Sequence, residues 1–237
     1  MKSLGRSLFL SAALVAAGFG QGVQAAPVVF TDGTFNDADW VTTIEVDTTP
    51  DLVVTAGQVP TGGNPDEFRS ITHQFTRFNT GTLHVQVSQV YNPAVQGAIE
   101  SIDFSADLKR LTPDRFLVHN FVIVQNGEPY ALLGGDVFNT FNDWTMVSKL
   151  NVTLADVSPR PVAFPLPDFS TSGAPIMFGY TGSAFSSATD LKTITSGLDN
   201  WRVTINRVKA PEPSTLALFL LGLLGIGLVA RRRKFEL

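Results

Sequence analysis

The stretch Val122-Ile123-Val124-Gln125-Asn126-Gly127-Glu128-Pro129-Tyr130-Ala131-Leu132 contains two apolar runs separated by Asn126-Gly127. Both central residues of a type I′ turn need a positive φ, which Asn and Gly adopt at low cost. An Asn-Gly pair between two apolar runs is therefore a strong signal of a two-residue β-hairpin. We expect two antiparallel strands that meet at this turn.

Alternation of apolar and polar residues continues on both sides of this hairpin, and helical periodicity is almost absent. In the stretch from Leu83 to Gln89, Leu83, Val85 and Val87 alternate with His84, Gln86 and Ser88, which predicts a strand whose polar face meets water. The same pattern predicts further strands at residues 40–47, 68–78, 98–104, 115–125, 129–133, 144–150, 175–180 and 201–209. Clusters of Gly, Pro, Asn and Asp separate these ranges. About nine or ten short strands in one domain indicate an all-β fold, an antiparallel β-sandwich of the jelly-roll type.

The N-terminal segment 1–25 has the three parts of a secretory signal peptide. Lys2 and Arg6 give a cationic start, Leu8–Phe19 is an apolar run, and Val23-Gln24-Ala25 places small residues at positions −3 and −1 of a cleavage site. We expect a signal helix and cleavage after Ala25. An uncleaved anchor is the alternative, but Gly18 interrupts the short apolar run.

The C-terminal segment 211–237 has a different construction. Pro211-Glu212-Pro213 is followed by an uncharged apolar segment, 214–230, and then by Arg231-Arg232-Arg233-Lys234. A helix over 214–230 would be about 25 Å long and would marginally span a bilayer core of about 30 Å. Basic residues beside such a helix favour the cytoplasmic side, so the preceding domain, 26–210, is expected outside. The two prolines keep Glu212 in an extended segment that a processing enzyme can reach.

This combination of features resembles the PEP-CTERM sorting signal of exopolysaccharide-producing Gram-negative bacteria. The resemblance covers residues 211–234. It implies recognition by an exosortase, a membrane transpeptidase-like enzyme, and removal of the transmembrane helix. Sorting and processing would depend on Pro211, Glu212, Pro213, Arg231, Arg232 and Arg233. Before processing, the protein would be anchored in the inner membrane with a cytoplasmic basic tail. Afterwards it would lie at the cell surface or in the extracellular matrix.

A second resemblance lies in the middle domain. The strand Pro175–Tyr180, a stretch rich in Ser and Thr, and the closing segment Leu198–Val203 are similar to the C-terminal third of laminin-G/concanavalin-like sandwiches. The resemblance supports a β-sandwich of that kind, which often precedes this sorting signal.

The composition of the exported domain excludes several functions. The chain has 17 basic and 21 acidic residues. Six basic and two acidic residues belong to the two ends, which leaves 11 and 19 in residues 26–210 and a net charge of about −8. An acidic domain argues against nucleic-acid binding, which needs a basic face. The chain has no cysteine, which excludes thiol catalysis and cysteine-bound metals.

Each tryptophan follows Asn or Asp residues, which suggests sugar contacts. In Thr140-Phe141-Asn142-Asp143-Trp144, an indole face can stack on a sugar ring while Asn142 and Asp143 bond to its hydroxyls; Trp40 follows a similar segment. The alternative is that each tryptophan begins a strand and packs inward behind an Asn/Asp turn. We expect Trp144 in a loop at the edge of the sandwich and Trp201 in the core.

Four aspartates are candidates for a structural calcium site. Calcium prefers hard oxygen ligands, and Asp32, Asp37, Asp39 and Asp199 could bring them together from distant segments. The alternative is that all four are solvated turn residues. Among the histidines, we expect His73 to be a hydrogen-bonded core residue and His84 to face solvent.

The sequence therefore predicts an exported surface or exopolysaccharide-matrix protein that binds polysaccharide, or another glycan, without catalysis. Its partners would be an exosortase, the inner membrane transiently, and the glycan, but no nucleic acid. One alternative is a structural matrix protein without a ligand site, and the other is a polysaccharide-modifying enzyme. Exposed aromatic residues on a concave sheet face would favour binding. Two carboxylates facing each other across a cleft would favour an enzyme.

Overall fold

The hairpin at Asn126-Gly127 forms as predicted. Strand β7 (Val118–Gln125) pairs antiparallel with β8 (Glu128–Leu132), and the two turn residues have φ angles of 56° and 82°. Both angles are positive, as a type I′ turn requires. The hairpin lies inside one of two larger sheets.

The structure is a computed structural model that describes residues 25–47, 51–113, 115–159, 165–187 and 189–208. Ala26–Arg207 forms one unit, which contains the whole hydrophobic core of the described residues and can therefore be produced as a separate domain. The predicted sorting signal and nearly all of the predicted signal peptide lie outside the described residues. No helix in the described part of the chain is long and apolar enough to cross a membrane.

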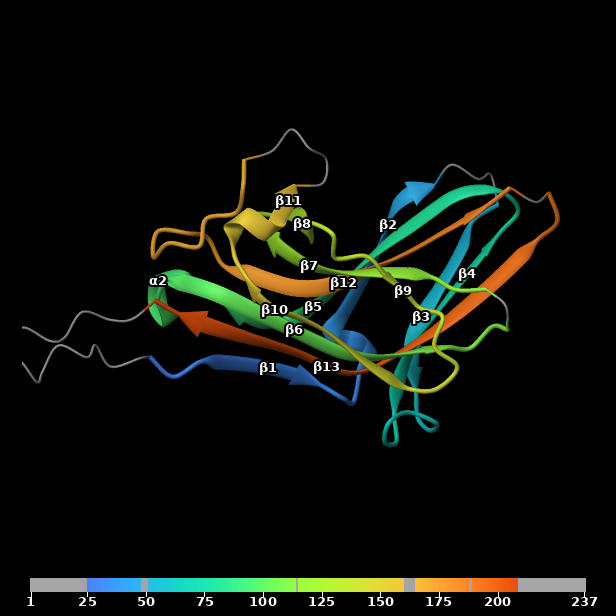
Figure 1. Ribbon diagram of the computed structural model, residues 1–237, viewed down its shortest axis with the longest axis horizontal. Coiled ribbons are helices and arrows are strands. Elements are labelled where there is room, and N and C mark those ends of the chain that lie inside the picture. The colour runs from blue at the N-terminus through green and yellow to red at the C-terminus, as the bar shows by residue number, and fades with distance from the viewer. Residues whose placement is uncertain (1–24, 48–50, 114, 160–164, 188, 209–237) are drawn as a thin grey trace, which may run out of the picture. The chain divides into compact units, whose positions relative to one another are not determined.

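Two antiparallel sheets make up this unit (Figure 1). Sheet A has the order β10-β6-β13-β4-β3, with β1 also paired to β13; sheet B has the order β11-β8-β7-β12-β5-β2, with β9 also paired to β7. The remaining strands are β1 (Val28–Asp32), β2 (Trp40–Asp47), β3 (Val53–Val59), β4 (Phe68–Phe75), β5 (Phe78–Tyr91), β6 (Ile99–Arg110), β9 (Val137–Phe138), β10 (Thr145–Val152), β11 (Val157–Pro159), β12 (Ile176–Ser186) and β13 (Lys192–Arg207). The predicted all-β, two-sheet antiparallel sandwich is confirmed.

Helix is confined to three short turns among the described residues. These are η1 (Asp37–Asp39), α2 (Pro93–Gln96) and η2 (Leu154–Asp156). Side chains of Asn36 and Asn92 cap the first two by accepting backbone hydrogen bonds. The near absence of helical periodicity in the sequence is thus reproduced in the structure.

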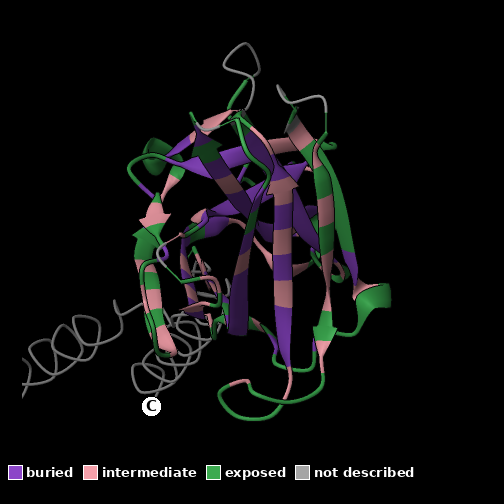
Figure 2. Cartoon of the chain, turned by 90° about the vertical axis from the view of Figure 1, so that its right-hand side faces the viewer, coloured by how far each residue is buried: buried purple, intermediate pink, exposed green. Residues whose placement is uncertain are grey.

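Aromatic side chains fill the space between the sheets. Phe104 of sheet A stacks on Phe121 of sheet B, with ring centroids 5.2 Å apart, and meets Phe178 at 6.0 Å. Buried and less buried residues alternate along many strands (Figure 2), as expected when one face of each sheet packs on the other sheet. Because the chain has no cysteine, this core supplies the stabilisation that disulfides would otherwise provide.

The interior also contains a polar network, which corrects the prediction for His84. His84 and Gln86 on β5 are fully buried and point between the sheets, whereas Leu83 and Val85 lie on the outer face. The ring of His84 hydrogen-bonds to Thr42 and Thr82 at 3.0 and 2.8 Å. These hydrogen bonds replace those that the ring would make with water, which allows His84 to be buried. The alternation therefore identified the strand correctly, but its polar face points into the interior.

His73 is a buried, hydrogen-bonded core residue, as predicted. Its two ring nitrogens contact the hydroxyls of Thr80 and Thr82 at 2.7 and 3.2 Å. The third histidine, His119, is also buried and bonds to the carbonyl of Thr181. All three histidines therefore belong to the interior.

Candidate functional site

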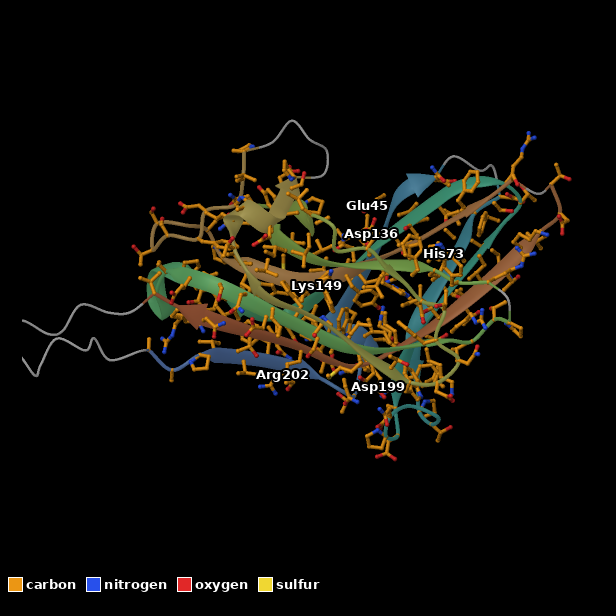
Figure 3. All side chains as sticks on the ribbon, in the orientation of Figure 1. Glu45, His73, Asp136, Lys149, Asp199 and Arg202 are labelled. Atoms are coloured by element: carbon orange, nitrogen blue, oxygen red, sulfur yellow. The ribbon has the colours of Figure 1, made fainter. Side chains whose placement is uncertain are left out.

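The outer face of sheet A carries a group of polar side chains that could contact a ligand. The strand register aligns these residues in rows across β10, β6 and β13. One row contains Lys109 and Gly197, the next contains Met146, Asp107 and Asp199, and a third contains Ser148, Ser105 and Arg202. Figure 3 shows Asp199 and Arg202 along β13.

A pocket of about 370 Å³ opens on this face, and we call it the Asp107 pocket. Two carboxylates, an amide, a guanidinium and hydroxyls line it, together with the thioether of Met146. The lining residues are Thr31, Asp32, Gly33, Ser105, Ala106, Asp107, Met146, Asn200, Trp201 and Arg202. Arg202 is exposed, and its side chain makes no hydrogen bond or ion pair with another residue in the described ranges. This set can donate and accept hydrogen bonds while the exposed side chain of Met146 supplies an apolar contact.

Asp107 is held by two asparagine side chains. The Nδ2 groups of Asn64 and Asn200 donate to its Oδ2 at 3.0 and 2.8 Å. The backbone N–H groups of the same two asparagines donate to Asp199, the cross-strand neighbour of Asp107. Asn64 belongs to the loop 60–67, so this network fixes the loop on the sheet and orients the carboxylate at the pocket wall.

Asp199 lies beneath this loop and is almost fully buried. Burial raises the pKa of its carboxyl, and the charges of Asp107 and Glu67 raise it further, while the two backbone hydrogen bonds oppose the shift. A Cβ on Gly63 of the loop would lie 2.6 Å from Asp199 Oδ2, which shows how closely the loop covers it. The two carboxylates therefore do not face each other across an open cleft.

Trp144 lies directly before β10 and is partly exposed. Its Nε1 donates to the carbonyl of Gly62 at 3.0 Å, and its ring meets Phe68 edge-on at 5.3 Å. The Nζ of Lys109 is 5.8 Å from the ring centroid. A Cβ on Gly197 would come within 2.6 Å of the ring, so this glycine lets the indole lie against the sheet. The indole is thus fixed in one orientation against β13 and β4 on the outer face of sheet A.

Asn142 and Asp143 are exposed beside Trp144, as the sequence predicted for a loop. The Oδ1 of Asn142 accepts a hydrogen bond from Arg110. The alternation of side chains along β10 places Trp144 on the same face as Met146 of the Asp107 pocket. The structure therefore brings one predicted sugar-contacting segment to the face of sheet A that carries the pocket.

Trp40 does not belong to this surface, and the prediction that it contacts sugar is wrong. Its ring is 5% exposed and packs against Trp201, Tyr180 and Phe35 with centroid distances of 5.5, 5.5 and 5.9 Å. Its Nε1 donates to Asp32 at 2.7 Å. Trp201 is 1% exposed, so its predicted place in the core is confirmed. Neither indole has a free face for a sugar.

The four aspartates predicted to bind calcium have separate partners. Asp32 accepts hydrogen bonds from the backbone of Thr34 and Phe35 as well as from Trp40. Asp37 forms an ion pair with Arg69 at 3.1 Å, and Asp39 lies in the turn η1. Asp199 belongs to the asparagine network described above. Within the described ranges, no group of three or more His, Asp or Glu side chains is placed to hold a metal ion, so the calcium site stays a prediction without structural support.

Sequence reasoning missed the residues that form the pocket. Asp107, Met146 and Arg202 lie on three different strands and meet only because β10, β6 and β13 are neighbours. The one available signal was the segment Asp199-Asn200-Trp201, in which Asp and Asn precede a tryptophan as they do at Trp144. In the structure it forms an irregularity in β13 that places Asn200, with a φ of 48°, at the pocket.

Comparison with protein families identifies the PEP-CTERM protein-sorting motif at residues 209–234. This match confirms the resemblance found at the C-terminus. The motif indicates export and exosortase-mediated processing at the cell envelope. It covers the tail and leaves the sandwich unassigned. No curated protein matches the chain in sequence.

Several solved β-sandwich modules are similar in structure. One is a family 11 carbohydrate-binding module from Clostridium thermocellum in complex with a β-1,3-1,4-mixed-linked tetrasaccharide, at 11% identity and a TM-score of 0.45, covering 78% of this chain and 99% of the module. Another is the xylan-binding CBM22-1 domain of Paenibacillus barcinonensis Xyn10C, at 10% identity and a TM-score of 0.40, covering 78% and 99%. A mannan-recognising module, TmCBM27, has 9% identity and a TM-score of 0.37, covering 80% and 100%.

Proposed function

We propose that this is an exported, exosortase-processed protein of the cell surface or exopolysaccharide matrix whose sandwich binds polysaccharide without catalysis. The binding surface is the outer face of sheet A, from Trp144 to the Asp107 pocket. The observation that carries the proposal is the pocket itself, where an oriented carboxylate, an amide and a free guanidinium stand beside an exposed apolar side chain.

The chemistry of this lining matches a sugar. A sugar hydroxyl can both donate and accept a hydrogen bond. It can therefore donate to the carboxylate of Asp107, accept from the guanidinium of Arg202, and do either with the amide of Asn200. The C–H faces of a sugar ring are apolar and would lie against Met146, which is 72% exposed, and against the open part of Trp144. The asparagine network orients Asp107 before any ligand arrives, which lowers the entropic cost of binding.

Binding is better supported than catalysis for this face. A glycosidase needs two carboxylates on opposite sides of the scissile bond, with room for the substrate between them. Asp107 and Asp32 both line the pocket, but Asp32 is buried and already accepts hydrogen bonds from Phe35 and Trp40. Asp199 is covered by the loop 60–67 and already accepts two backbone hydrogen bonds. Asp107 and Asp199 are arranged to hold the loop on the sheet.

The experiment is a glycan array probed with the unit Ala26–Arg207, with and without calcium, followed by titration of the strongest ligand. Met146→Ala should weaken binding about fivefold to tenfold because an apolar contact is lost. Leu150→Ala is the matched control, since this residue is also on β10, is 66% exposed and does not line the pocket. Equal effects of the two substitutions, or no glycan binding at all, would contradict the proposal.

A further inference from the structure

Strand β3 forms one edge of sheet A, because it pairs only with β4 (Figure 1). Its sequence, Val-Val-Thr-Ala-Gly-Gln-Val, has no charged residue and no proline, and its register with β4 is continuous. An edge strand presents unpaired N–H and C=O groups, which can pair with a strand of another molecule. Proteins that stay monomeric usually protect such edges.

The other edge strands in the described ranges carry protecting features. β2 contains Glu45 and Asp47 and has a bulge between its paired residues. β10 contains Lys149 and a register shift directly after it. β11 is only three residues long and ends at Pro159, and β9 has two residues. On β1, the carbonyl of Thr31 accepts a side-chain hydrogen bond from β5. β3 has none of these features over most of its length.

One hydrogen bond near the end of β3 shows which backbone groups of this strand point away from β4. The N–H of Gln58 donates to Oδ1 of Asp37 at 3.0 Å and therefore points away from β4. In an antiparallel pair, alternate residues direct their backbone groups to the same side. Ala56 and Val54 thus also direct their N–H and C=O groups outward, and no described residue outside β4 bonds to them. Asp37 covers the edge only near Gly57 and Gln58.

We propose that this edge pairs antiparallel with β3 of a second copy of the chain, with Val54 facing Val54 across a two-fold axis. In that register Val53 faces Thr55 and Leu52 faces Ala56, so the outward groups of both strands meet each other. The paired stretch stops before the segment that Asp37 covers.

A second copy fits this edge because the stretch 52–56 is complementary to itself. An interface with two-fold symmetry places the same patch of both molecules together, which brings like charges into contact wherever the patch is charged. The stretch itself has no charge, so no like charges meet between its paired residues. Pairing joins the two copies of sheet A into one continuous sheet. None of the residues that line the Asp107 pocket belongs to the stretch 52–56.

The first test is cross-linking of the unit Ala26–Arg207 carrying Val54→Cys. Because the chain has no cysteine, any disulfide must join two molecules. Facing residues in a hydrogen-bonded antiparallel pair have Cα atoms about 5.5 Å apart, within the range that a disulfide spans. We expect a covalent dimer to form on mild oxidation at least about tenfold faster than for Val41→Cys, a control on the edge strand β2.

The second test is sedimentation equilibrium of the wild-type unit, Thr55→Lys and Thr43→Lys, after circular dichroism has shown that all three are folded. Thr55 and Thr43 are both exposed, on β3 and β2 respectively. The dimeric fraction of the wild type should increase with protein concentration. Thr55→Lys should raise the Kd of the dimer at least about tenfold, whereas Thr43→Lys should change this Kd by less than about twofold. The proposal is overturned if the wild type is monomeric up to about 1 mM, if Thr43→Lys weakens the dimer as much, or if Val54→Cys cross-links no faster than the control.

Discussion

Lowering the pH from 7.5 to 5 should destabilise the sandwich strongly because its histidines are buried uncharged. Burial lowers the pKa of His73 to about 4, with a further contribution from His119. Burial likewise lowers the pKa of His119 to about 4, against a small opposing effect of its hydrogen bond to Thr181. Burial, and next the charge of Arg69, lowers the pKa of His84 well below its usual value.

The sign of the effect follows from the unfolded chain, where a histidine has a pKa of about 6.5. Between pH 6.5 and pH 4 the unfolded state binds protons that the folded state does not. Stability is therefore constant above pH 7, falls as the pH drops through 6.5, and levels off below 4, where the folded histidines also become protonated. The raised pKa of Asp199 acts in the opposite direction over part of this range.

The magnitude of the loss follows from the pKa values of His73 and His119. At pH 5, a histidine with a pKa of 6.5 in the unfolded chain and about 4 in the folded one costs about 2 kcal/mol of unfolding free energy. His73 and His119 together should then remove about 4 kcal/mol, a large part of the stability of an ordinary domain. His84 adds to this loss.

Urea unfolding of the unit Ala26–Arg207 at several pH values between 7.5 and 5 measures this loss. His119→Gln keeps a polar side chain at the position and removes one titrating group, so its unfolding free energy should fall about 2 kcal/mol less over the same range. An unfolding free energy that stays constant between pH 7.5 and pH 5, or an unchanged pH dependence in His119→Gln, would refute the reasoning.

Three further predictions concern the core, the indole at the site and the tail. Trp201→Ala should lower the unfolding free energy by about 3–5 kcal/mol, because it removes a fully buried indole; a loss below about 1 kcal/mol in thermal or urea unfolding would contradict its place in the core. Gly197→Ala should displace the indole of Trp144, since the new Cβ would lie 2.6 Å from the ring. This substitution should weaken glycan binding about as much as Trp144→Ala does. If glycan titrations of both variants match the wild type, Trp144 does not belong to the site. Intact-mass analysis of protein exported from a host with an exosortase should show loss of the predicted C-terminal helix, 214–230. Recovery of full-length chain alone would contradict processing.

The sequence was most informative where the structure depends on local rules. The Asn126-Gly127 hairpin formed with the expected turn, and β2 has the predicted bounds Trp40–Asp47. Trp201 is in the core, as its place at the start of an apolar strand indicated. Each of these features depends on residues close together in the chain, so the local pattern is sufficient to predict it.

Features that depend on distant residues were predicted less well. The alternation in β5 gave the strand but not its orientation, because His84 finds partners in Thr42 and Thr82 that no local pattern reveals. Strand β3 was not predicted, since its residues between Val53 and Val59 alternate weakly. The Asp107 pocket forms only because three strands that are far apart in the sequence, β6, β10 and β13, lie side by side in sheet A.

Backbone amide NMR tests whether the outer face of sheet A binds polysaccharide. The unit Ala26–Arg207 would be titrated with the oligosaccharide that scores highest on the glycan array. We expect shift changes concentrated at Asp107, Asn200 and Arg202 and at the indole N–H of Trp144. Shift changes confined to the outer face of sheet B, around Val41 and Met177, would show that polysaccharide binds to the other sheet.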